Sequence, residues 1–186
     1  ISGALLKTKL YVPHLRPDRV PRQRLLQRLR QGLPGRKLTL ISAPAGYGKT
    51  TLLAQWIAQA EHPVAWLSLD EGDDDPARFL AYLTAAMRRL PEFPSSPSPD
   101  GVEYAGDGEA RLTALLNQAS ELPKLAVLVL DDFHRLTEPI VHRYVAYLVD
   151  HMPPSLALVV ATRADPPLPI ARLRAEGQLT EIRQAE

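Results

Sequence analysis

The chain has 186 residues, with 22 Lys or Arg against 21 Asp or Glu, so its formal net charge is only +1. That length suffices for one α/β domain with a hydrophobic core. The chain has no cysteine, which excludes disulfides, thiolate metal sites and a cysteine nucleophile, and no apolar run approaches the roughly 20 residues of a membrane span. Its start has no basic segment followed by an apolar stretch, so we expect a cytoplasmic globular domain.

The charges are distributed unevenly along the chain. Residues 1–50 hold 11 basic and 1 acidic side chain, whereas residues 51–100 hold 3 basic and 8 acidic ones. A basic segment followed by an acidic one suggests a site for anions, which are either nucleotide or nucleic acid.

Short apolar runs alternate with segments of helical periodicity. The runs predict strands at Leu38–Ser42, Val64–Leu69, Leu125–Leu130, Leu156–Ala161 and Leu179–Arg183. The other segments predict helices at Pro21–Leu33, Lys49–Ala60, Pro76–Leu90, Glu109–Glu121 and Pro139–Met152. Runs that are apolar at every position are typical of strands buried on both faces, so the alternation indicates a parallel, doubly wound α/β sheet.

Two further segments are expected to be loops. The acidic residues 70–75 predict a solvated loop that ends in the helix cap Asp75, with contact between Asp70 and the site as the alternative. Pro91–Gly108 is rich in Pro, Ser and Gly and predicts an exposed, flexible loop. Because the chain ends soon after the last expected strand, we expect it to be a piece of a longer protein.

The segment between the first strand and the next helix has the pattern of a phosphate-binding loop. Gly46 and Gly48 allow the backbone to turn so that successive amides face one anion at the start of a helix. Ala43 stands where the strict pattern has glycine, and an ordinary strand–turn–helix with a surface lysine is the alternative. The residues expected to bind the nucleotide here are Ala45, Gly46, Tyr47, Gly48, Lys49, Thr50 and Thr51, with Lys49 on the β- and γ-phosphates and Thr50 on Mg²⁺.

Charged residues follow two of the later strands. Asp131 and Asp132 end the third predicted strand, where ligands bind in open α/β sheets. We expect Asp131 to hold Mg²⁺ and Asp132 to orient or deprotonate the attacking water; the alternative is a solvated loop. Arg163 follows the fourth strand and would contact the γ-phosphate, unless it merely covers the edge of the sheet.

Two other residues are candidates for the same site. Arg22 falls inside the apolar stripe of the first predicted helix, and a charge there requires a partner. That partner would be a nucleotide's base, ribose or phosphate, or else an acidic side chain, and Val20 would offer apolar surface to the base. His134 follows the aspartate pair and would sense metal or phosphate, or else be an ordinary surface or packing histidine.

Six segments together resemble a known family. They are Leu5–Leu10, Arg19–Arg22, Ser42–Thr51, Trp66–Asp70, Leu130–His134 and Ala161–Asp165. In order and spacing they closely resemble the nucleotide-binding domain of MalT-type regulators, which are large ATP-binding LuxR-family transcription factors of the STAND class of NTPases. In that family alanine is normal at the position of Ala43.

The resemblance implies a single nucleotide-binding domain over residues 1–186, with an N-terminal segment and helix at 1–35 and an additional-strand P-loop NTPase core at 36–186. Its strand order would be 5-1-4-3-2. The resemblance also implies a switch that ADP holds at rest, that ATP and an inducer release for self-association, and that slow Mg²⁺-dependent hydrolysis resets. Winged-helix, helical-repeat and helix-turn-helix domains would follow in the longer protein, and this domain would not bind DNA itself.

Other functions stay open at this point. A P-loop kinase for a small metabolite would need an arginine-bearing lid, and residues 91–108 contain no arginine. A STAND protein with an effector other than a transcription factor domain is a second alternative. A DNA-binding module on the basic N-terminal face is a third, although no helix-turn-helix spacing is present.

Overall fold

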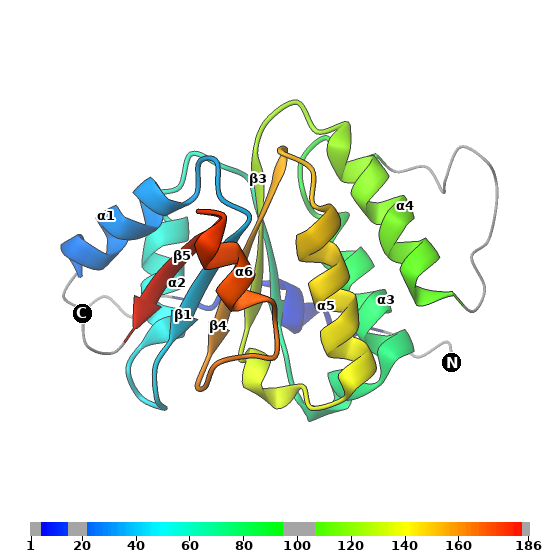
Figure 1. Cartoon of the computed structure of the whole chain (residues 1–186), viewed down its shortest axis with the longest axis horizontal. Helices are drawn as coiled ribbons and strands as arrows, with labels where there is room; N and C mark the ends of the chain where they lie inside the picture. Colours follow the sequence, from blue (N-terminus) through cyan, green and yellow to red (C-terminus); the bar gives the residue numbers. More distant parts are fainter. Residues whose placement is uncertain (1–4, 15–21, 95–106, 184–186) are drawn as a thin grey trace.

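Parallel strands form one sheet in the computed structural model, which describes residues 5–14, 22–94 and 107–183 (Figure 1). The strands are β1 Leu38–Ser42, β2 Val64–Ser68, β3 Ala126–Asp131, β4 Leu156–Thr162 and β5 Leu179–Arg183. Their order is β2-β3-β4-β1-β5, which is the predicted order 5-1-4-3-2 read from the other edge. Each predicted strand agrees with the observed one to within one residue at either end.

The described helices agree with the predicted ones, with additions. They are α1 Gln23–Gly32, α2 Lys49–Ile57, α3 Pro76–Met87, α4 Gly108–Ser120, α5 Pro139–His151 and α6 Ile170–Ala175, with 3-10 helices η1 Lys7–Leu10, η2 Glu71–Asp74 and η3 Phe133–Arg135. Asp75 caps α3 as predicted, because its carboxylate accepts from the backbone N–H of Arg78 at 2.8 Å. Helix α6 and the 3-10 helices were not predicted.

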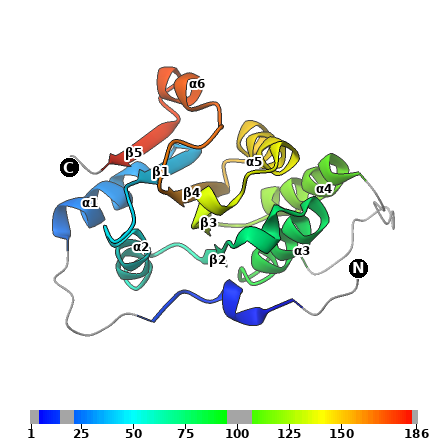
Figure 2. The same ribbon diagram turned by 90° about the horizontal axis from the view of Figure 1, so that it is seen from below.

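Helices cover both faces of the sheet (Figure 2). On one face α1 and α2 bring Leu29 and Trp56 against Val129 and other residues of the strands. On the other face α3, α4, α5 and α6 form a second core, to which η1 adds Leu10. The strands are largely apolar because both of their faces are covered in this way, although β5 also carries Glu181 and Arg183.

The acidic segment at residues 70–75 is mostly exposed, as predicted, but it departs from a solvated loop at Asp73 and forms the 3-10 helix η2. Asp73 is fully buried, and its carboxylate forms ion pairs with Lys9 of η1 and with Arg78, the latter at 3.3 Å. Asp70 forms an ion pair with Lys9 at 2.9 Å. This segment therefore fastens the N-terminal segment to the start of α3.

In a parallel sheet the carboxyl ends of all strands lie on the same side of the molecule. The loops after β1, β3 and β4 therefore bring the phosphate-loop sequence, Asp131 and Arg163 to the same side of the molecule. Within the described ranges, no helix has both the length and the apolarity needed to cross a membrane. Most of the predicted loop at residues 91–108 lies outside the described residues, as does Val20.

Candidate functional site

The loop from Ala43 to Gly48 curls over the N-terminus of α2. Gly46 has φ +80° and Gly48 has φ +72°, values that favour glycine over residues with a side chain. Gly48 occupies the N-cap position of α2 and supplies no side-chain cap. Free amide groups at the start of a helix, together with its positive dipole end, form a binding site for phosphate.

Lys49 lies across this loop. Its ammonium donates hydrogen bonds to the carbonyl oxygens of Ala43 at 2.6 Å and of Pro44 at 3.1 Å. The side chain is largely buried, and burial lowers the pKa of Lys49 while Asp132 acts in the opposite sense. The structure therefore holds a cation at the loop that precedes α2, where it would face a bound phosphate.

Thr50 and Asp131 meet directly beneath the loop. The Thr50 hydroxyl donates to Asp131 Oδ2 at 2.8 Å, while Asp131 Oδ1 is buried without a hydrogen-bond partner. Burial, with a contribution from neighbouring Asp132, raises the pKa of Asp131 to about 6. A buried, unsatisfied carboxylate oxygen next to a hydroxyl is a donor set that fits Mg²⁺.

Protein ligands alone would not complete such a metal site. Among the described residues there is no group of three or more His, Asp or Glu side chains that could hold a metal ion. Mg²⁺ usually binds through one or two protein oxygens together with water and substrate phosphates. The pair formed by Thr50 and Asp131 agrees with that mode of binding.

Asp132, His134 and Arg163 lie close enough to Lys49 of the phosphate loop to interact with it electrostatically. Asp132 has φ +58° and a side chain that is 44% exposed, and its Oδ1 lies 3.9 Å from His134 Nδ1. Burial and the charge of Arg163 lower the pKa of His134, whose two ring nitrogens are buried without hydrogen-bond partners. The charges of Asp132 and Arg163 also act on Lys49, so the structure brings these predicted residues together.

Arg22 differs from its prediction in one respect. The structure places it at the N-cap of α1 as an exposed residue, not on the buried face of the helix. Its guanidinium donates a hydrogen bond to the backbone carbonyl of Tyr47 at 2.8 Å. Arg22 nevertheless lies at the phosphate loop, as expected of a nucleotide contact.

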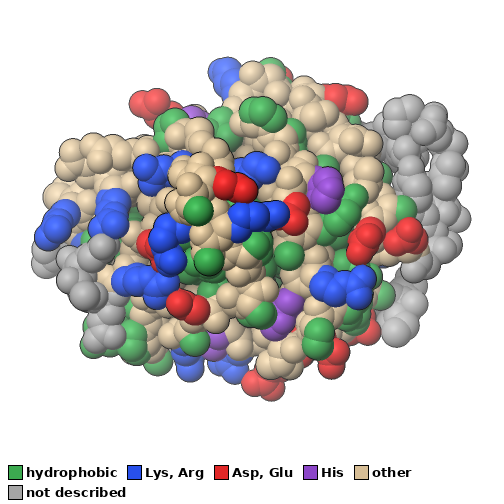
Figure 3. Space-filling view, in the orientation of Figure 1, with side chains coloured by type: hydrophobic (Ala, Val, Ile, Leu, Met, Phe, Trp, Pro, Cys, Tyr) green, Lys and Arg blue, Asp and Glu red, His purple; other side chains and the backbone are tan. Residues whose placement is uncertain are grey.

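The sequence did not reveal the ionic residues on β5. Arg183 and Glu181 are separated by two positions and so share one face of the strand, and Arg183 forms an ion pair with Asp165, just beyond Arg163. In Figure 3, Lys and Arg side chains gather over α1 and β5. Near β5, Asp and Glu side chains lie among them. The one available signal was the alternation of Glu181 and Arg183 with the buried Thr180 and Ile182.

Comparison with known proteins identifies relatives of the chain. A family model described as an AAA domain matches residues 21–166. The chain is 38% identical over 180 residues to the HTH-type transcriptional regulator MalT of Cronobacter sakazakii and 39% identical over 181 residues to that of Yersinia enterocolitica. Each alignment covers 96% of this chain and 20% of the relative, so the chain spans about a fifth of the length of these curated proteins. The predicted resemblance to MalT-type regulators is confirmed.

A solved structure with the same fold is Cdc6p from Pyrobaculum aerophilum. It aligns with a TM-score of 0.55 and 19% sequence identity over 92% of this chain and 46% of that chain. At such low identity the likeness shows the fold alone, which is that of P-loop ATPases. The predicted fold class is thereby confirmed.

Proposed function

The chain belongs to the AAA domain family, and from this premise we propose that it is the ATP- and ADP-binding switch domain of a signal-responsive transcriptional regulator. The observation that carries the proposal is the juxtaposition of Lys49 on the phosphate loop with the pair formed by Thr50 and Asp131. A cation, the N-terminus of a helix and a Mg²⁺-binding oxygen pair are elements on which nucleoside triphosphate binding relies.

Each residue of the site has a proposed part in binding. The backbone N–H groups of residues 45–51 would donate hydrogen bonds to the phosphates, Lys49 would neutralise their charge, and Arg22 would approach the nucleotide from α1. Thr50 and Asp131 would hold Mg²⁺, which would neutralise phosphate charge. Val20, close to Arg22 in the sequence, is proposed to contact the base.

Slow ATP hydrolysis is proposed for the same site. Asp132 is partly exposed and lies near Lys49, so its carboxylate is available to orient or accept a proton from the attacking water. Arg163, exposed and close to Lys49, would contact the γ-phosphate and respond to its loss. Both residues are placed by the ends of neighbouring strands, β3 and β4.

The domain would act as part of a longer regulator. The curated relatives are described as HTH-type transcriptional regulators and are about five times as long as this chain. We propose that winged-helix, helical-repeat and helix-turn-helix domains follow it, and that ATP binding promotes self-association. DNA would then be bound by the helix-turn-helix domain and not by this one.

Replacement of Lys49 tests the nucleotide site. Lys49→Ala removes the cation beside the phosphates and should weaken ADP and ATP binding by about 2–3 kcal/mol, or roughly 30- to 160-fold. The matched control is Lys124→Ala. Lys124 is exposed and precedes β3, so it lies near the amino ends of the strands, away from the phosphate loop at their carboxyl ends. Titration calorimetry with Mg²⁺ gives both affinities, and circular dichroism checks the fold. Equal ADP affinity in the two variants would show that the nucleotide does not bind at Lys49.

A further inference from the structure

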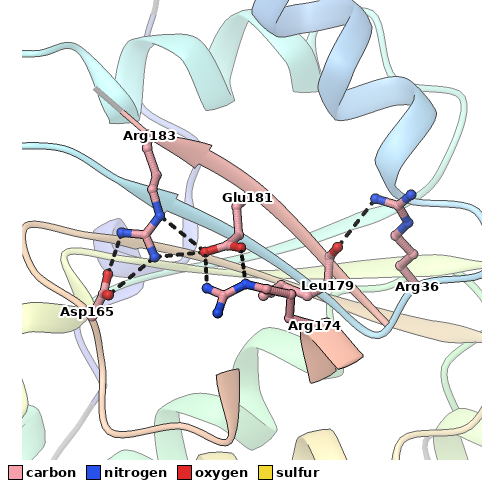
Figure 4. Close-up of polar contacts among 6 residues, drawn as sticks. All are labelled: Arg36, Asp165, Arg174, Leu179, Glu181 and Arg183. Carbon is pink, nitrogen blue, oxygen red and sulfur yellow. Dashed lines mark hydrogen bonds and ion pairs between the residues drawn. The ribbon is translucent and has the colours of Figure 1, made fainter. Parts of the chain in front are cut away.

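Arg183 and Asp165 form an ion pair that crosses the end of β1 (Figure 4). In the sheet β1 lies between β4 and β5, and Ser42 is level with both Thr162 of β4 and Arg183 of β5. Ser42 is the last residue of β1, directly before the phosphate loop. The ion pair therefore joins the two strands that flank the strand carrying the phosphate loop.

Several hydrogen bonds hold this ion pair in place. Arg183 donates from Nη1 to Asp165 Oδ1 at 2.8 Å and from Nη2 to Oδ2 at 3.2 Å, the two-point geometry that arginine forms with carboxylates. Arg183 also donates to Glu181 Oε1 at 2.7 Å from Nη2, and Arg174 of α6 donates to both oxygens of Glu181. Hydrogen bonds from Arg174 and Arg183 lower the pKa of Glu181 to about 2, so this carboxylate stays charged at neutral pH.

The turn that carries Arg163 is short, so holding Asp165 also restrains Arg163. Thr162, before Arg163, is buried, and its hydroxyl donates to the carbonyl of Ala164 at 2.8 Å. The residue after Asp165 is Pro166, whose ring fixes φ. Arg163 itself is exposed, and a long side chain loses conformational entropy when a ligand orders it. A turn whose backbone is already fixed on both sides of Arg163 leaves only the side chain to be ordered, so the total cost of the contact is lower.

We propose that the ion pair between Arg183 and Asp165 positions the Arg163 turn beside the phosphate loop and thereby sets the preference for ATP over ADP. The inference rests on the proposed function, because Arg163 is the residue assigned to the γ-phosphate. The side chains of Asp165 and Arg183 are 59% and 38% exposed, and exposed ion pairs contribute little to the free energy of unfolding. Positioning accounts for this arrangement better than stability does.

The variants Asp165→Asn and Arg183→Gln test this inference. Affinities for ADP and for a non-hydrolysable ATP analogue are measured by calorimetry with Mg²⁺, beside the thermal midpoint of each variant. Each substitution should lower the affinity for the analogue relative to ADP by about 3- to 10-fold, the usual size of coupling between contacting residues. ADP affinity and the thermal midpoint should stay unchanged. The double variant should lower the affinity for the analogue relative to ADP by no more than either single variant does.

The two substitutions separate positioning from simple electrostatics, because they change the local charge in opposite directions. ATP carries more negative charge than ADP, so charge alone would raise the preference for ATP in Asp165→Asn and lower it in Arg183→Gln. Opposite shifts in the two variants would overturn the inference. The matched control Arg174→Gln loses its contacts with Glu181 but leaves the pair with Asp165 intact, and an equal effect there would also overturn it.

The same titrations distinguish this inference from the proposed function. If the unsubstituted protein bound neither ADP nor the ATP analogue, the proposed function would be wrong and the inference with it. If it binds both and the variants keep its preference, the function stands and the positioning role of Arg183 and Asp165 is wrong.

Discussion

Asp131 is the residue whose environment least suits its charged form. Its side chain is buried at the end of β3, one oxygen accepts from Thr50, and the other has no hydrogen-bond partner. Burial raises its pKa to about 6. In protein free of Mg²⁺ and nucleotide, the carboxylate is therefore a source of instability, which a bound cation would relieve.

This environment predicts a particular dependence of stability on pH. The folded protein keeps the Asp131 proton up to about pH 6, whereas an unfolded chain releases it near pH 3.8. Between these values the folded state binds more protons, so the free energy of unfolding falls as the pH rises from about 4 to 7. In Asp131→Asn this fall should disappear, and the metal-free variant should be about 1–3 kcal/mol more stable than the wild type at pH 8. Urea unfolding in EDTA at several pH values measures both.

A neighbouring substitution provides the control. Asp132→Asn also removes an acidic charge, but the Asp132 side chain is 44% exposed, so the fall in stability with pH should persist there. Asparagine also tolerates the positive φ of this position. If Asp131→Asn were as sensitive to pH as the wild type, the buried carboxyl group would not be the source of the effect.

At the scale of the elements, the strands and longer helices could be predicted because each depends on local pattern. Strands such as β3 and β4 are apolar up to their last residue, and the helices have clear periodicity. Helix α6 could not be predicted, because it has six residues and buries only Leu173. The buried position of Asp73 depends on Lys9, which lies 64 residues away in the sequence. Composition alone therefore could not distinguish the buried Asp73 from its exposed acidic neighbours.

The candidate site also combines features that local sequence specifies with features that depend on residues distant in the sequence. The phosphate loop and the aspartate pair lie within continuous motifs, and the structure brings Lys49, Thr50 and Asp131 together as expected. Arg22 was predicted on a buried helix face, because the helical wheel assumes that the helix includes it, whereas it lies at the N-cap. The role inferred for Arg183 depends on the register of β5 beside β1, which no local pattern specifies.

The contact between α4 and α5 offers a test at the same scale. Gly108 is the first residue of α4, and a Cβ atom built there would lie 2.0 Å from the Tyr144 hydroxyl oxygen of α5. Gly108→Ala should therefore push the two helices apart and lower the free energy of unfolding by about 1–3 kcal/mol, as measured by urea unfolding.

The background of Tyr144→Ala serves as the control for that prediction. Because the ring is absent there, the added methyl group has space, and Gly108→Ala should be nearly neutral. Strong non-additivity of this kind marks residues in direct contact. An equal loss in both backgrounds would place the cause in the backbone of α4 and not in the approach of Tyr144.

At the scale of the whole molecule, the N-terminal segment is fastened beside β2, the strand at one edge of the sheet, whereas β5 forms the other edge. The amide of Leu6 donates to the Tyr82 hydroxyl at 3.0 Å, and the Lys9 ammonium lies 4.4 Å from the centre of the Tyr82 ring. Lys9 also forms ion pairs with Asp70 and with the fully buried Asp73. These contacts join η1, η2 and α3, elements that are distant in the sequence.

Lys9→Met should lower the stability of the whole molecule without changing its nucleotide site. Methionine fills a similar volume, but the substitution leaves the buried Asp73 carboxylate with only the exposed Arg78 as an ionic partner. Loss of one partner of a buried ion pair lowers the free energy of unfolding by about 3–5 kcal/mol. Because the contact with Arg78 remains, we expect a decrease at the lower end of this range, about 3 kcal/mol. Lys7→Met, in the same 3-10 helix but exposed, is the matched control and should be nearly neutral. Urea unfolding measures both, and calorimetry should give unchanged ADP affinity for the folded variants. Equal stability of the two would mean that Lys9 does not compensate the buried charge of Asp73.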